Sequence, residues 1–81
     1  MDDLDPTRPK WPQIAESLAE RITGGKWKPG HKITVPEIMA EFGVSKVTAG
    51  KVTAELRKRR LVRTEFGMGS FVTELEARGE Q

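Results

Sequence analysis

The feature that most constrains this fold is a single glycine, Gly43, which separates two helical patterns. Apolar residues recur at the three- and four-residue spacing of one helix face before it, and a second such series follows it. The two series are Ile38, Met39 and Phe42, and then Ala49, Val52 and Leu56. Because Gly43-Val44 leaves only a short break, residues 36–56 are predicted to fold as helix, tight turn, helix.

Both of these helices carry a start signal. Thr34-Val35-Pro36-Glu37 has the spacing of a capping box, and Pro36 falls in the first turn, where its missing N–H donor is harmless. Ser45 is a favoured N-cap residue for the second helix. The basic residues Lys51 and Lys58 and the apolar Val47 are expected on the outward face of that helix.

An amphipathic helix is predicted ahead of this motif, over residues 12–23. Ile14, Leu18 and Ile22 recur at four-residue spacing with charged residues between them, and Gly24-Gly25 ends the pattern. A turn signal follows, and residues 31–33 are expected to pair as a short strand. Aromatic residues at positions 11, 27, 42 and 71 are interpreted as packing residues.

Two further strands are predicted near the end of the chain, over residues 61–65 and 70–74. Phe66-Gly67-Met68-Gly69 joins them, and its glycines suit a hairpin turn. The predicted class is therefore α+β, a winged helix-turn-helix with three helices and a small antiparallel sheet whose hairpin is the wing. We expect this domain to span residues 11–74, between flexible tails at 1–10 and 75–81.

Length and composition exclude several kinds of protein. At 81 residues the chain supports one small core, so an enzyme with a water-excluding site is not expected. Cysteine is absent and His31 is the only histidine, which argues against a metal site, and no cofactor is predicted. No run approaches the roughly 20 apolar residues of a membrane span, and the acidic N-terminus is unlike a signal peptide. The expected location is the cytoplasm, at the nucleoid.

Positive charge gathers on one part of the chain. Residues 45–63 hold seven basic side chains and one acidic side chain, Glu55, although the formal net charge of the whole chain is only +2. Basic charge concentrated on one element is typical of a protein that binds a polyanion. The four consecutive residues 57–60 have a second interpretation, which is that they complement the C-terminal end of the helix.

Over residues 11–72 the sequence resembles the DNA-binding domain of GntR-type transcriptional regulators. Five short motifs, in the family's order, carry the resemblance. They are Trp11-Pro12-Gln13-Ile14-Ala15, Lys28-Pro29-Gly30, Glu41-Phe42-Gly43-Val44-Ser45, Leu61-Val62-Arg63 and Gly67-Met68-Gly69-Ser70-Phe71-Val72. The resemblance implies that the helix from Ser45 enters the major groove of duplex DNA and that the wing lies near the minor groove.

The sequence departs from the family pattern at four places. The Arg that the family carries before the first motif helix is absent at Thr34-Val35-Pro36. Gly50 and Met68 stand where the family commonly has arginines, and Arg60 stands where it has a helix-ending glycine. With nine residues after Val72, we expect no separate effector-binding or dimerisation domain.

Residues on the start of the second motif helix and on the wing are the predicted DNA contacts, because a helix in the major groove presents its N-terminal residues to the bases. Lys46 and Lys51 match basic positions of the family. Ser45 has an alternative role as a helix cap, and Lys51 as a solvated lysine. The predicted set is Thr34, Ser45, Lys46, Val47, Thr48, Gly50, Lys51, Arg63, Gly67, Met68 and Gly69.

The function predicted from the sequence is a sequence-specific regulator of transcription, a repressor, that binds double-stranded DNA. Two alternatives remain at this point: a winged helix that binds proteins, motivated by the missing arginines, and an architectural DNA binder of low specificity. We expect a monomer or weak dimer in solution that places two copies on an inverted repeat.

Overall fold

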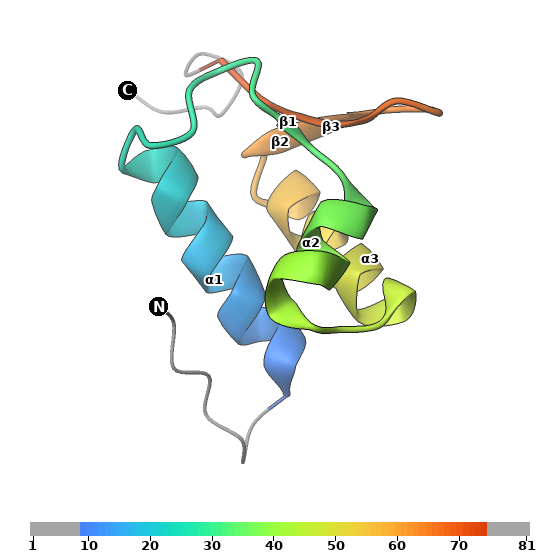
Figure 1. Cartoon of the computed structure of the whole chain (residues 1–81). Helices are drawn as coiled ribbons and strands as arrows, with labels where there is room; N and C mark the ends of the chain where they lie inside the picture. The colour runs from blue at the N-terminus through green and yellow to red at the C-terminus, as the bar shows by residue number, and fades with distance from the viewer. Residues whose placement is uncertain (1–8, 75–81) are drawn as a thin grey trace.

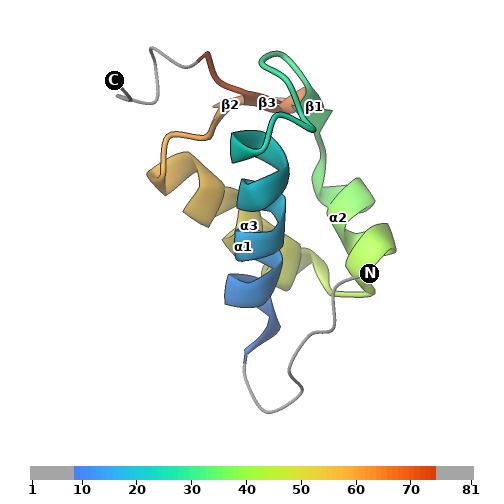
Figure 2. The ribbon, with the colours of Figure 1, turned by 90° about the vertical axis from the view of Figure 1, so that its left-hand side faces the viewer.

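A three-stranded antiparallel sheet lies across one end of three helices (Figure 1), in a computed structural model that describes residues 9–74. The core draws buried side chains from every helix and strand, and α1 packs across α3 (Figure 2). The elements in chain order are α1 (Lys10–Thr23), β1 (Lys32–Ile33), α2 (Val35–Phe42), α3 (Lys46–Lys58), β2 (Val62–Glu65) and β3 (Gly69–Val72). The predicted class, a winged helix-turn-helix, is confirmed.

Helix α1 begins at Lys10, two residues before the predicted start at residue 12. Pro9 occupies the N-cap position in an extended conformation, and its carbonyl accepts a hydrogen bond from Gln13 Nε2 at 3.1 Å. Pro12 therefore sits in the first turn, where a helix tolerates proline. The inward face of α1 is fully apolar and consists of Ile14, Ala15, Leu18, Ala19 and Ile22.

The capping box predicted for α2 is present. The Thr34 hydroxyl accepts a hydrogen bond from the Glu37 amide at 3.3 Å, and Glu37 Oε1 accepts one from the Thr34 amide at 3.0 Å. Gly43 ends the helix with a φ of 64°, a left-handed conformation that suits glycine. Helix α3 then begins after Ser45, so the predicted tight turn between the two helices is confirmed.

Helix α3 ends in a conformation that its sequence disfavours. Arg60 has a φ of 62° and is the one residue other than glycine with positive φ in the described part of the chain. The Leu61 amide donates to the Leu56 carbonyl at 3.0 Å, which closes the helix end. Thr73 Oγ1 donates to the Arg60 carbonyl at 2.7 Å, so this backbone position is also tied to the residue after β3.

The sheet order is β1-β3-β2, and β3 lies between two antiparallel neighbours. The strands are shorter than predicted, and the pair Leu61 and Thr73 lies one position beyond the ladder, with a hydrogen bond from the Thr73 amide to the Leu61 carbonyl at 3.0 Å. Predicted tail residues 1–8 and 75–81 lie outside the described residues. Within residues 9–74, no helix is long and apolar enough to cross a membrane.

Candidate nucleic-acid interface

Helix α3 divides into a buried side and an exposed side. Ala49, Val52 and Leu56 are fully buried, as the sequence pattern predicted. On the outward side Lys46 and Lys51 are exposed, and the Val47 side chain is 69% exposed. Among residues 9–74 the ammonium group of neither lysine takes part in a hydrogen bond or ion pair. This face therefore offers two uncompensated cations and one apolar side chain.

The start of α3 is held by its own side chains. Ser45 Oγ accepts a hydrogen bond from the Thr48 amide at 3.2 Å, which makes Ser45 the N-cap that the sequence predicted. Thr48 Oγ1 lies 3.3 Å from Ser45 Oγ and is partly exposed beside it. Nothing lies within 4 Å of the position that a Cβ would take at Gly50, so this glycine has no packing requirement. It leaves open space on the outward face of the helix.

The hairpin between β2 and β3 depends on two glycines in conformations that other residues rarely adopt. Gly67 has a φ of 79° and Gly69 a φ of 126°. A Cβ at Gly69 would also lie only 3.2 Å from the Ile33 carbonyl oxygen of β1. Figure 1 shows the hairpin tip and the turn between α2 and α3 projecting to the same side of the molecule. The wing tip and the start of α3 therefore face the same side, as two parts of one proposed interface.

A hydrogen-bonded chain joins α3 to this wing. Arg57 Nη1 donates to Thr64 Oγ1 at 2.9 Å, and Thr64 Oγ1 lies 3.0 Å from Ser70 Oγ on the facing strand. Thr64 and Ser70 are cross-strand partners in the register of β2 and β3. The guanidinium of Arg57 therefore links the helix to the hairpin. Sequence analysis placed Arg57 only in a basic run, since its partner is seven residues away on another element.

The other residues of the basic run, 58–60, differ in their contacts. Arg59 Nε donates to Glu55 Oε2 at 2.9 Å, and Arg59 Nη1 donates to Glu16 Oε1 of α1 at 3.2 Å. The hydrogen bond to Glu55, and to a smaller extent the one to Glu16, raises the pKa of Arg59 above its ordinary value. Arg59 thus holds α1 against α3, while Lys58 and Arg60 are exposed.

At the edge of the wing, Arg63 and Glu65 form an ion pair within β2. The guanidinium of Arg63 also lies 5.1 Å from the ring centre of Phe71, which is a cation–π distance. Arg63 is more than half exposed at its side chain. The structure therefore places this predicted DNA contact on the outer edge of the sheet, next to the hairpin turn. Thr34, the remaining member of the predicted set, is partly exposed at the cap of α2.

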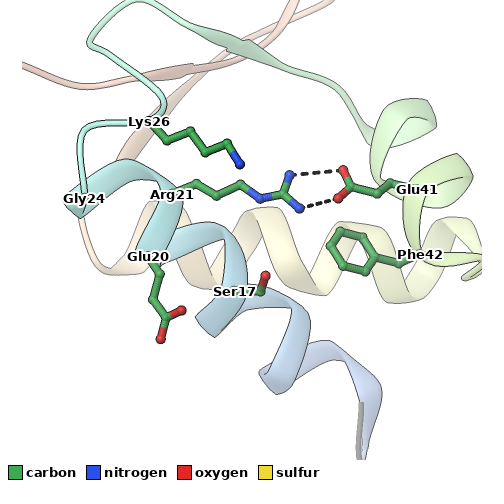
Figure 3. Close-up of a pocket in the computed structure, with 7 residues that line it drawn as sticks. All are labelled: Ser17, Glu20, Arg21, Gly24, Lys26, Glu41 and Phe42. Atoms are coloured by element: carbon green, nitrogen blue, oxygen red, sulfur yellow. Dashed lines mark hydrogen bonds and ion pairs between the residues drawn. The ribbon is translucent and has the colours of Figure 1, made fainter. Parts of the chain in front are cut away.

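A hollow lies between α1 and α2, and no residue of α3 or the wing lines it (Figure 3). Its volume is about 430 Å³, and the paired side chains of Arg21 and Glu41 cross it, with Nη1 of Arg21 3.1 Å from Oε1 of Glu41. The Arg21 guanidinium also lies 5.0 Å from the Trp27 ring and 5.8 Å from the Phe42 ring. This hollow is a structural junction between two helices.

Within residues 9–74, no group of three or more His, Asp or Glu side chains comes together. His31 instead stacks on Trp27, with ring centres 4.7 Å apart.

Three helices, a capped helix-turn-helix and a hairpin anchored beside its second helix define the winged-helix class of domain. A family model described as bacterial regulatory proteins, gntR family, matches residues 11–72. The chain belongs to this family.

Curated and solved relatives agree with this assignment. The chain is 34% identical over 68 residues to the mannosyl-D-glycerate transport/metabolism system repressor MngR of Escherichia coli (strain K12), covering 83% of this chain and 28% of the repressor. A GntR family transcriptional regulator from Listeria monocytogenes superposes with a TM-score of 0.83 at 28% identity, over 93% of this chain and 67% of that one.

A further relative was solved with DNA. BusR of S. agalactiae, in complex with its busAB-promotor DNA, superposes with a TM-score of 0.76 at 28% identity, over 88% of this chain and 35% of BusR. The chain thus spans well under half the length of both MngR and BusR.

Proposed function

We propose that this chain is a DNA-binding repressor of transcription that reads duplex DNA with the outward face of α3 and steadies the complex with its wing. The observation that carries the proposal is the uncompensated pair Lys46 and Lys51 on a helix face beside an anchored hairpin. MngR carries a repressor's name, and BusR was solved on its promoter DNA. Neither relative favours the alternative of a protein-binding winged helix.

Base reading is assigned to the first turns of α3. An α-helix fits the major groove, where each base pair presents a distinct pattern of donors, acceptors and methyl groups. Lys46 reaches a guanine edge, and the exposed Val47 side chain packs on a thymine methyl group. Gly50 has no side chain, and nothing lies within 4 Å of the position that a Cβ would take, so the backbone of α3 can approach the wall of the major groove closely there.

Phosphate contacts are assigned to groups around this reading helix. The hydroxyl of Thr48 and the ammonium of Lys51 lie on the same exposed side, and free amides at the start of α3 favour an anion. Ser45 Oγ caps the helix by accepting from the Thr48 amide, a role that is compatible with the predicted DNA contact of its hydroxyl. Thr34 at the start of α2 and Arg63 on the wing contact the flanking backbone, while Gly67, Met68 and Gly69 bring the wing tip to the minor groove.

The expected operator is an inverted repeat bound by two copies. One domain of this size covers only a few base pairs, and a two-fold pair reads half-sites about one helical turn apart. Sedimentation of the free protein and of its complex with the selected duplex checks this proposal. A monomer or weak dimer that becomes two copies per duplex is expected. A tight free dimer contradicts the first part, and a one-to-one complex on the full site contradicts the second.

Selection of binding sites from a random duplex pool tests the proposed function. An enriched sequence, bound at least about a thousandfold more tightly than scrambled duplex at the same salt concentration, supports a specific regulator. Equal affinity for all sequences indicates an architectural binder. Absence of binding at low salt overturns the DNA assignment.

A further inference from the structure

We propose that Phe66 at the tip of the wing is an apolar wedge that enters the minor groove, unstacks one base step and bends the DNA. This inference rests on the proposed function and adds a distortion of the duplex to it. It assigns a role to a side chain for which sequence analysis found none. The wing would then also contribute to sequence preference, because the free energy needed to unstack a base step depends on its sequence.

Phe66 differs from every other aromatic residue of the chain, which has two tryptophans, three phenylalanines and no tyrosine. Trp11, Trp27 and Phe42 pack against the core, and Phe71 lies beneath the guanidinium of Arg63. The Phe66 side chain is fully exposed at 103%, and Met68, two residues on, is 58% exposed. Hairpin turns favour Gly, Asn, Asp and Ser, so two large apolar side chains in one turn call for an explanation.

The turn that carries Phe66 is held in place from both sides. The Met68 amide donates to the Glu65 carbonyl at 3.0 Å, and Gly67 and Gly69 supply the positive φ angles that the turn needs. Below the turn, the hydrogen bonds of Thr64 with Ser70 and Arg57 connect the hairpin to α3. The apolar tip therefore stands on a hydrogen-bonded turn that is linked to the proposed reading helix, as a wedge requires.

The charges around the tip suit a groove lined by phosphates. Glu65 is the one acidic residue in the hairpin from 62 to 72, and Arg63 pairs with it. Lys32 of β1 runs along the base of the wing, because its Cε would lie 3.3 Å from a Cβ placed at Gly69. Because Glu65 compensates Arg63, Lys32 is, within residues 9–74, the uncompensated cation beside the apolar tip, and its charge suits a narrow groove whose walls are negative. An aromatic side chain and a methionine are both among the apolar wedges that such proteins insert.

The test uses the full chain and the selected duplex. Dyes at the two ends of the duplex report its bend by energy transfer. In separate duplexes 2-aminopurine replaces one base at successive steps outside the major-groove half-site and reports unstacking. Wild-type protein should bend the duplex by about 20° or more and raise 2-aminopurine fluorescence at one step. Phe66→Ala should lose both signals and bind about fivefold to a hundredfold more weakly. Phe66→Leu, which keeps an apolar wedge, should retain most of the bend.

Two controls separate this inference from the proposed function. Lys51→Ala should weaken binding while leaving the bend of the bound duplex unchanged, because Lys51 lies on α3. Phe66→Ala should keep the wild-type thermal midpoint, since the ring is fully exposed. Specific binding with no bend, or an equal bend with Phe66→Ala, overturns the wedge and leaves the regulator intact. No specific DNA binding overturns both.

Discussion

Arg57 of α3 donates a hydrogen bond from Nη1 to Oγ1 of Thr64 on β2, over 2.9 Å. Thr64 in turn lies within hydrogen-bond distance of Ser70 on β3. A side chain near the end of the proposed reading helix is therefore bonded to the wing. The two parts of the proposed interface are connected by this bond as well as by the short segment between α3 and β2.

The first prediction concerns this connection. Arg57→Ala and Thr64→Val should each lower DNA affinity, and the double variant should lose less than the sum, because both remove the same bond. Since the pair is exposed, we expect a coupling energy for folding of only about 0.5–1 kcal/mol. A double-mutant cycle in urea, repeated for DNA binding, measures it. Strictly additive effects on binding would show that the bond does not position the wing.

Arg60 provides a prediction about stability. Its φ of 62° costs an ordinary residue about 1 kcal/mol relative to glycine. Arg60→Gly should therefore stabilise the domain by about 0.5–1 kcal/mol. Arg60→Ala removes the same charge and keeps a Cβ, so it should give no such gain. If both variants are stabilised equally, the charge and not the backbone conformation is responsible.

Two core truncations should lower the free energy of unfolding by different amounts. Leu56 is fully buried on α3, so Leu56→Ala should cost about 2–5 kcal/mol of unfolding free energy. Phe42 is only partly buried, beside the Arg21 guanidinium, and Phe42→Ala should cost less, about 1–2 kcal/mol. Urea denaturation gives both values. An unchanged midpoint for Leu56→Ala would contradict the position of α3 over the core.

Local signals in the sequence predicted the helix-turn-helix well. The capping box at Thr34, the glycine break at Gly43 and the cap at Ser45 are all present, because each depends on residues within one turn of the chain. The spacing of buried residues on α3 was equally predictable, since a helix repeats every 3.6 residues.

Features that depend on distant partners were not predictable in this way. In the sequence Arg59 is one of four consecutive basic residues and shows no separate role. The structure shows that it bonds Glu16, 43 residues away, and so takes part in the contact between α1 and α3. The end of β3 was predicted two residues too far along the chain, and the contact found there, from Thr73 Oγ1 to the Arg60 carbonyl, joins residues 13 positions apart. Only one feature of the sequence pointed to the proposed role of Phe66, which is that a large apolar residue stands in a predicted hairpin turn.

The most direct test of the central claim measures affinity for the selected duplex between about 50 and 200 mM salt, using Lys46→Ala, Lys51→Ala and the control Lys26→Ala. Lys26 is exposed after α1 and lines the hollow between α1 and α2, outside the proposed interface. Lys51→Ala should lower the salt slope by about one, and Lys46→Ala should cost about 1–3 kcal/mol and relax preference at one base pair. Lys26→Ala should bind as wild type does. Wild-type affinity and slope for both α3 variants, with unchanged thermal midpoints, would contradict the assignment of α3 as the reading helix.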